Sequence, residues 1–379
     1  MIHPPKRLLY GPGPTMVDPR VYSAMGQPIV GHLDPFFFSV VEDIRAGLRE
    51  VFGTSNDFTL AISGTGSAGM EAAVANFVEP GQKFAVLANG FFCDRLVEMG
   101  KRHRGDVVRF DKPWGEGFSD AEAREFILRE KPDVVAFVQA ETSTGVYNAG
   151  KGICDAARDV GALTIADCVT SLGAMPVEID ANGIDVAYSC TQKGLSAPPG
   201  LSPITVSPRA LERLRARKAT IDTWYLDLKL IDEYFEGPKR YHHTAPITLF
   251  YALQAALDAV REEGLANRLA RHKRAHERLV AGLEELGMEM LVPAGQRIWN
   301  LNTPKIPAGV TDAEIRKHLM EKYGMEVAGG FGTLAGKILR LGIMGPLASD
   351  EGVNNVLGAI AEALPGGIGA GSTSSRATT

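Results

Sequence analysis

Short apolar segments alternate with helical ones over residues 58–210, and this alternation constrains the fold more than any other feature of the chain. The runs Phe58–Ile62 and Val134–Val138 are almost entirely apolar, as is usual for strands buried on both faces. The stretches Ala68–Phe77 and Ala121–Arg129, which lie between such runs, have the composition of helices. Strands that alternate with helices favour a mostly parallel sheet covered by helices. The chain is therefore predicted to be an α/β protein.

The pattern changes after residue 245, where longer helices precede short strands. The expected helices are Ile247–Glu262, Ala266–Leu286, Thr311–Tyr323 and Asp350–Leu364, and the expected strands are Met290–Val292, Trp299–Asn302 and Lys337–Ile343. We therefore predict an N-terminal arm (residues 1–25), a large domain (26–245) and a smaller C-terminal α/β domain (246–365). The last residues, 366–379, are nearly all Gly, Ser, Ala and Thr, and such a composition predicts a disordered tail.

Charge and cysteine content exclude several functions. Lys and Arg number 40 and Asp and Glu 45, so the net charge is −5, unlike that of a protein that binds nucleic acid through a basic face. Four cysteines, at 93, 154, 168 and 190, form no Cys-x-x-Cys pair, which excludes zinc knuckles and thioredoxin-like sites. We find no secretory leader and no apolar run of membrane-spanning length. The sequence predicts a cytoplasmic protein that binds neither membrane nor nucleic acid.

A glycine-rich loop, Ser63–Gly69, follows the first predicted strand and opens a helix. Backbone N–H groups in such a loop, together with the helix dipole, favour a bound phosphate. The loop also matches G-x-G-x-x-G, but a dinucleotide site needs an acidic residue about 20 positions further on. Ala88–Gly90 occupies that place. A phosphate cradle is the favoured interpretation, a plain tight turn is the alternative, and a nicotinamide-dependent dehydrogenase is a remote one.

Three charged residues end or interrupt predicted strands. Asp167 ends an apolar strand, at the edge of an α/β sheet where ligands usually bind, and a cation such as a protonated pyridine nitrogen would pair with it. Lys193 follows another strand among small residues, and a lysine in a desolvated pocket can act as nucleophile or base. Arg340 interrupts an apolar strand, where its fork suits a substrate carboxylate. A helix-capping aspartate, a solvated surface lysine and a structural ion pair are the respective alternatives.

Taken together, these features resemble the class V aminotransferases, which use pyridoxal phosphate, and specifically their alanine–glyoxylate and serine–glyoxylate group. The motifs that carry the resemblance run in family order along nearly the whole chain: Gly11–Pro14, Ser63–Gly66, Ala88–Gly90, Glu141–Gly145, Ala166–Asp167, Gln192–Lys193, Ala197–Gly200, Tyr241–Thr244 and Gly336–Gly342. The resemblance implies the aspartate-aminotransferase fold (fold type I), with a large domain built on a mostly parallel sheet and a smaller C-terminal α/β domain.

The same resemblance implies roles for individual residues. Lys193 would form the aldimine with the cofactor, Asp167 would pair with its ring nitrogen, and Thr142 would lie near its ring hydroxyl. The phosphate would be held by Thr65, Gly66, Ser67 and Gln192, and by Tyr241 and Thr244 of a neighbouring subunit, which implies a homodimer with shared active sites. Arg340 would bind the substrate carboxylate. Two departures from a known relative are Phe92, where that relative has a stacking Trp, and Ser67, where it has His.

The activity implied is ping-pong transamination between a small amino acid, alanine or serine, and glyoxylate, giving glycine and a 2-oxo acid. A serine–pyruvate or broader small-amino-acid aminotransferase is the alternative. The residues that can be placed in the active site offer no second cation for a distal carboxylate, which favours amino donors with neutral side chains over aspartate or glutamate.

Other members of the same fold are less compatible with the sequence. A cysteine desulfurase needs a cysteine in its C-terminal half, and none follows Cys190. A ureidoglycine-specific branch has Asn in place of Tyr241. No metal is expected, because the adjacent His242 and His243 cannot easily converge on one ion.

Overall fold

The computed structural model describes residues 2–235 and 239–365. Its central sheet has seven strands in the order β2-β10-β9-β8-β5-β3-β4. The five strands from β9 to β4 are parallel, whereas β10 runs antiparallel to both of its neighbours. The strand bounds are β2 Thr59–Ser63, β3 Lys83–Ala88, β4 Asp106–Asp111, β5 Val134–Val138, β8 Leu163–Asp167, β9 Val186–Tyr188 and β10 Leu201–Val206. The predicted α/β class with a mostly parallel sheet is confirmed.

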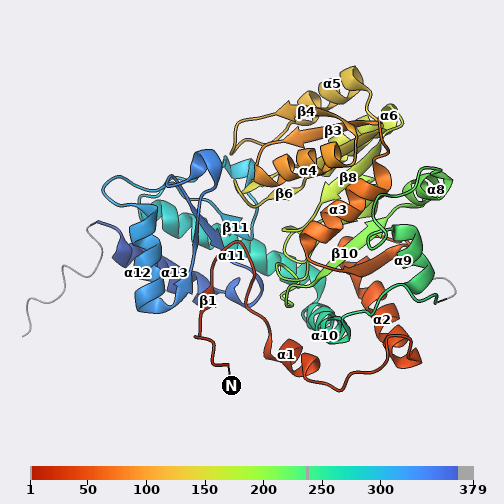
Figure 1. Cartoon of the computed structure of the whole chain (residues 1–379). Helices are drawn as coiled ribbons and strands as arrows, with labels where there is room; N and C mark the ends of the chain where they lie inside the picture. The colour runs from red at the N-terminus through yellow and green to blue at the C-terminus, as the bar shows by residue number, and fades with distance from the viewer. Residues whose placement is uncertain (1, 236–238, 366–379) are drawn as a thin grey trace, which may run out of the picture.

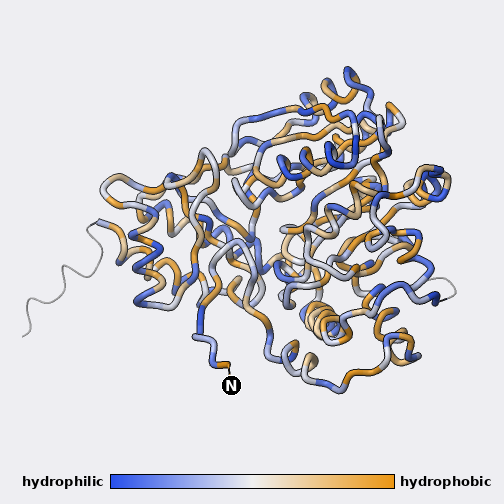
Figure 2. Tube along the Cα trace, viewed as in Figure 1, coloured by the Kyte–Doolittle hydropathy of each residue, from blue (hydrophilic) through white to orange (hydrophobic). Residues whose placement is uncertain are grey.

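Helices cover this sheet, and α3 and α4 pack against each other, as do α5 and α6. The helices of this part are α2 Pro35–Phe52, α3 Gly66–Phe77, α4 Phe91–Arg102, α5 Asp120–Glu130, α6 Gly150–Asp159, α7 Ile179–Asn182, α8 Pro208–Ala216, α9 Leu228–Phe235 and α10 Ile247–Glu263. Figure 2 shows hydrophobic segments along the central strands and hydrophilic residues on outer helices such as α5. A small hairpin, β6 Ala140–Glu141 with β7 Val146–Tyr147, follows β5.

The C-terminal part has its own sheet, ordered β11-β14-β13, and its own apolar core. The elements are α11 Leu265–Glu285, β11 Leu301–Asn302, α12 Asp312–Tyr323, β12 Met325–Glu326, β13 Ala328–Gly329, β14 Leu339–Gly342 and α13 Asp350–Ala363. We call this part, from Leu265 onward, the small lobe, and the preceding part the large lobe. The predicted helix after Thr311 is confirmed, with Thr311 as its N-cap.

Several expectations need correction. Met290–Val292 is not a strand, since only an isolated bridge joins Met290 to Pro304, and proline has no N–H to extend a ladder. The N-terminal arm is more regular than predicted, because β1 (Leu8–Leu9) pairs with β12 and α1 (Pro19–Met25) packs on α10. Helix α10 packs into the core of the large lobe.

Helix α2 was not predicted, although its capping signals are present in the sequence. Asp34 is its N-cap, Pro35 opens its first turn, and Gly53 ends it in the left-handed conformation at φ 64°. The tail predicted for residues 366–379 lies outside the described residues. Within the described ranges, no helix is both long and apolar enough to cross a bilayer, and no group of three or more metal-ligating side chains converges.

Candidate active site

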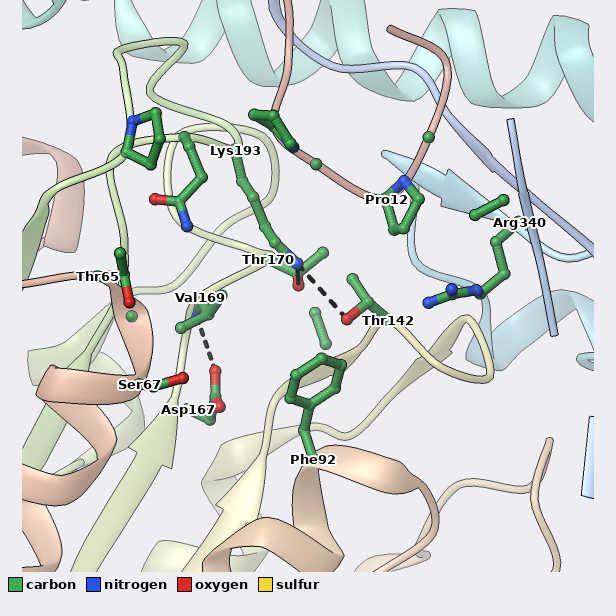
Figure 3. A pocket seen from close by; sticks show the side chains of 18 of the residues that line it. Pro12, Thr65, Ser67, Phe92, Thr142, Asp167, Val169, Thr170, Lys193 and Arg340 are labelled. Atoms are coloured by element: carbon green, nitrogen blue, oxygen red, sulfur yellow. Dashed lines mark hydrogen bonds between the residues drawn. The ribbon is translucent and has the colours of Figure 1, made fainter. Parts of the chain in front are cut away.

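A cavity of about 560 Å³ opens between the two lobes at the carboxyl ends of the parallel strands, the edge at which α/β proteins bind ligands. Figure 3 shows its walls, to which the N-terminal segment, the large lobe and the small lobe all contribute. Nine of the predicted site residues line it: Thr65, Gly66, Ser67, Phe92, Thr142, Asp167, Gln192, Lys193 and Arg340. Segments far apart in sequence therefore meet here.

Tyr241 and Thr244 do not line this cavity. Both side chains are exposed, Tyr241 by 57%. The two histidines between them are buried, and His243 Nε2 lies 2.7 Å from Ser63 Oγ. The histidines thus anchor the segment at the end of β2 while its outer residues face away from the chain. Their predicted contact with a neighbouring subunit stays a prediction.

Asp167 ends β8 and is 2% exposed. Its carboxylate accepts hydrogen bonds from the Val169 N–H at 2.8 Å and from the Tyr188 hydroxyl at 2.9 Å. The parallel pairing of β8 with β9 places Tyr188 directly beside it. Burial raises the pKa of Asp167 to about 6, against the opposing effect of these two hydrogen bonds. A cation placed next to this carboxylate would stabilise its charged form.

Lys193 extends into the cavity from the loop after β9 (Figure 3). Its Nζ donates to Thr170 Oγ1 at 3.2 Å and to Thr142 Oγ1 at 3.5 Å. Burial lowers the pKa of this amine, which favours the neutral, nucleophilic form. The Phe92 ring lies nearby, with its centroid 5.8 Å from Nζ. The sequence singled out Thr142 and Phe92 but missed Thr170 and Tyr188.

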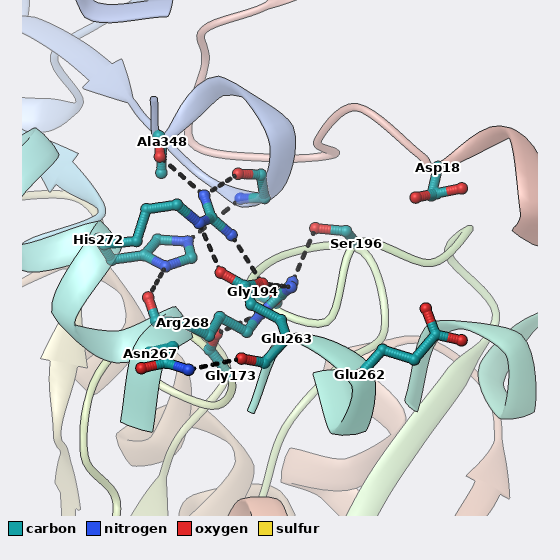
Figure 4. A network of polar contacts seen from close by, with 12 residues as sticks. Asp18, Gly173, Gly194, Ser196, Glu262, Glu263, Asn267, Arg268, His272 and Ala348 are labelled. Carbon is teal, nitrogen blue, oxygen red and sulfur yellow. Dashed lines mark hydrogen bonds and ion pairs between the residues drawn. The ribbon is translucent and has the colours of Figure 1, made fainter. Parts of the chain in front are cut away.

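The loop that carries Lys193 is fixed from behind by α11, as Figure 4 shows. The Arg268 guanidinium donates to the carbonyl oxygens of Gly194 at 2.7 Å and Gly173 at 3.0 Å. The lysine loop also packs tightly on the segment around Leu172. A Cβ at position 194 would lie 2.2 Å from the Leu172 carbonyl oxygen, so this packing requires glycine there. One turn later, His272 accepts a hydrogen bond from the Gly345 N–H. Helix α11, the first helix of the small lobe, thus contacts both the lysine loop and the turn at Gly345.

The predicted phosphate cradle lies at the start of α3. Thr65 is the N-cap residue, and its side chain makes no capping hydrogen bond, so first-turn N–H groups of α3 are left for a ligand. Gly69 has a packing role instead of a dinucleotide role, since a Cβ there would lie 2.1 Å from Ser202 Oγ. Arg95 of α4 also lines the cavity, and its Nη1 donates to Ser67 Oγ at 3.0 Å. Arg95 is thus a cation of the cavity that the sequence had not placed there, and whether it meets a distal carboxylate is not decided by this contact.

Arg340 enters the cavity from β14 of the small lobe and is 5% exposed. Its Nε donates to the Gly329 carbonyl oxygen at 2.7 Å, and its guanidinium carbon lies 3.8 Å from the centroid of the Phe331 ring. Burial lowers the pKa of Arg340 to about 10, so it remains charged at neutral pH. Both Nη groups are left to receive a carboxylate. No sequence motif indicated Phe331, which lies in an irregular loop.

Among the described residues, Asp167, Lys193 and Arg340 form no direct ion pair, although all three are nearly buried. The charges closest to act on them are their own and that of the buried Glu141. Buried charges are normally paired, so the cavity calls for a ligand that supplies a cation, an electrophile and a carboxylate. Pyridoxal phosphate together with an amino acid has these three groups. The donor set therefore fits this cofactor, and a cavity of about 560 Å³ is in the range that holds small ligands.

Comparison with known proteins agrees with this chemistry. Residues 10–344 match the family described as Aminotransferase class-V. A crystal structure of alanine–glyoxylate aminotransferase from Nostoc sp. superposes with a TM-score of 0.94 at 44% identity, covering 96% of this chain and 97% of that one. A ureidoglycine–glyoxylate aminotransferase from Bacillus subtilis gives 0.93 at 36%, covering 95% and 93%. The alanine–glyoxylate aminotransferase of Oryctolagus cuniculus is 36% identical over 95% of this chain and 93% of its own length.

Proposed function

The chain belongs to the class V aminotransferase family, and on that premise we propose that it transfers the amino group of a small amino acid, alanine or serine, to glyoxylate. The products are glycine and the corresponding 2-oxo acid. The similarity to alanine–glyoxylate aminotransferases, both in sequence and in structure, supports this choice. The wider alternative is a serine–pyruvate or small-amino-acid aminotransferase.

One observation carries the proposal: three buried ionisable groups that form no direct ion pair among the described residues face a single cavity. We propose that Asp167, Lys193 and Arg340 receive the ring nitrogen, the aldehyde carbon and the substrate carboxylate. Thr65, Gly66, Ser67 and Gln192 would hold the phosphate, Thr142 would lie near the ring hydroxyl, and Phe92 would pack on the ring. Bound pyridoxal phosphate would supply an electron-withdrawing ring that stabilises negative charge at the substrate α-carbon.

The chain's own residues divide the remaining work. The Lys193 amine, which lies within hydrogen-bond distance of Thr142 and Thr170, would take the proton from the substrate α-carbon as general base. Asp167 keeps the proton on the ring nitrogen, because a charged carboxylate beside that nitrogen favours its protonated form. Phe92 covers the ring and excludes water from that face. Arg340 holds the carboxylate that amino acid and 2-oxo acid share, so both substrates use one site in turn.

The proposal includes a homodimer. Two buried histidines anchor the segment 241–244 and leave Tyr241 and Thr244 outside the chain's own cavity. An exposed tyrosine on such an anchored segment is suited to contact a second copy, where its hydroxyl would reach the partner's phosphate. Sedimentation of the loaded protein should give twice the monomer mass. A location in the cytoplasm stays a prediction.

The test is a panel of amino donors with glyoxylate or pyruvate as acceptor. We expect alanine or serine to be the fastest amino donor with glyoxylate as acceptor, and each half-reaction to proceed in the absence of the other substrate. We expect the Lys193→Ala variant to lose both turnover and the visible absorbance of bound cofactor. A K218A variant, which changes an exposed lysine, is the matched control. Ureidoglycine as the best donor would overturn the donor assignment. Full turnover by Lys193→Ala would overturn the mechanism.

A further inference from the structure

Arg95 lies at the rim of the cavity, next to the predicted phosphate cradle. It projects from the first half of α4, lines the cavity, and donates from Nη1 to Ser67 Oγ at 3.0 Å. Its guanidinium carbon lies 5.0 Å from the centroid of the Phe92 ring and 5.5 Å from that of Phe91. Two aromatic rings and a hydroxyl therefore hold this cation in one place.

This guanidinium has no carboxylate partner in the described part of the chain. The neighbouring Asp94 pairs with Arg109 at 2.9 Å, and no ion pair of Arg95 is present among residues 2–235 and 239–365. An arginine that is oriented by ring contacts but lacks an anion is suited to bind one, because its fork matches phosphate oxygens.

The phosphate cradle otherwise lacks charge. Thr65, Gly66, Ser67 and Gln192 are all neutral, whereas the phosphate of the cofactor carries close to two negative charges at neutral pH. Three cations line the cavity: Arg95, Lys193 and Arg340. Lys193 is committed to the threonine hydroxyls, and Arg340 lies in the small lobe against Phe331. Of these three cations, Arg95 is the one whose side chain donates a hydrogen bond to a side chain of the cradle, that of Ser67.

We infer that Arg95 is the cationic ligand of the cofactor phosphate, reaching it beside Ser67. The inference rests on the proposed function, because it presumes that pyridoxal phosphate occupies the cavity. It also bears on specificity: a guanidinium engaged by phosphate is not free to bind the distal carboxylate of aspartate or glutamate. The neutral donors expected from the sequence then remain the preferred ones, even though a second cation is present.

The experiment compares cofactor binding by the cofactor-free protein and its variants Arg95→Ala and Arg95→Lys. Each is titrated with pyridoxal phosphate and with pyridoxal, which lacks the phosphate, and inorganic phosphate is added as a competitor. Arg102→Ala is the matched control, because Arg102 lies on the same helix, is exposed and pairs with Glu98 outside the cavity. Circular dichroism verifies that each variant is folded.

We expect Arg95→Ala to weaken pyridoxal phosphate binding about 10- to 100-fold, the factor typical of a lost hydrogen bond to a charged group. The affinity of Arg95→Ala for pyridoxal should change less than about twofold, and inorganic phosphate should compete less well with pyridoxal phosphate in this variant. Arg95→Lys should bind pyridoxal phosphate with intermediate affinity. Arg102→Ala should bind both ligands as the unaltered protein does. Equal losses for both ligands, or unchanged phosphate-ester binding with a raised KM for aspartate, would overturn the inference. If the unaltered protein binds neither ligand, the proposed function itself fails.

Discussion

Replacing Arg340 by lysine keeps a positive charge in the cavity but removes the fork that a carboxylate would meet. Nε is already used by the Gly329 carbonyl oxygen and one face by Phe331, which leaves two Nη groups for the substrate. Lysine can replace one of these hydrogen bonds at most. A hydrogen bond to a charged partner contributes about 1.5–3 kcal/mol, so kcat/KM should fall about 10- to 150-fold. Arg340→Ala removes both and should cost about 3–5 kcal/mol.

Single-turnover half-reactions provide the assay, one with alanine and one with glyoxylate. In the proposed role of Arg340, both substrates place their carboxylate against it, so both kcat/KM values should fall by a similar factor, mainly through KM. Arg278→Lys is the control, because Arg278 is an exposed arginine of α11 that pairs with Asp350. A loss confined to one half-reaction would refute the shared-carboxylate reasoning. An unchanged kcat/KM for Arg340→Ala would remove Arg340 from the site altogether.

Three further changes have defined outcomes. Tyr188→Phe removes a hydrogen bond that stabilises charged Asp167, so the pKa of Asp167 should rise from about 6 by about one to two units. The acidic side of the pH profile of cofactor affinity should move to higher pH by the same amount. An unchanged pH profile would contradict this. Burial lowers the pKa of His272 to about 3 from 6.5, so only the unfolded state binds its proton between these values. As the pH is lowered from 6.5 towards 3, the free energy of unfolding should therefore fall by up to about 1.4 kcal/mol per pH unit. Urea unfolding at pH 7 and 5 should show a shallower loss for His272→Gln but not for the exposed-site control His3→Gln. Tyr241→Phe should speed cofactor release on dilution, and unchanged release would indicate that one subunit holds the phosphate alone.

The sequence predicted most of the large-lobe sheet because buried strands leave an apolar run that no other element imitates at that length. It also placed Asp167, which ends such a run, and Lys193, which lies in the loop after the next strand. Tyr188 could not be assigned to the site in the same way. Its contact with Asp167 depends on the parallel pairing of β8 with β9 and on their register, which no local pattern specifies.

The residues missed at the rim have a different cause. Arg95 and Phe331 belong to separate lobes and meet the cavity only after the lobes pack together. Phe331 touches Phe91 of the large lobe, with ring centroids 5.1 Å apart, and stacking of this kind leaves no trace in sequence spacing. Helix α10 packs against α2, and this contact was equally inaccessible, because α2 itself was not predicted.

The cavity's two walls come from different halves of the polypeptide, and this separation has an evolutionary consequence. The proposed reaction groups, Asp167 and Lys193, belong to the sheet side, whereas the short strands β12 and β13 with Val327 between them, and the loop of Phe331, approach from the opposite side. Substitutions in those segments would change which amino acid fits without altering the proposed reactive amine. Substrate specificity could therefore diverge among related proteins through changes in the small-lobe wall of the cavity, while the wall that carries the reactive groups stays the same.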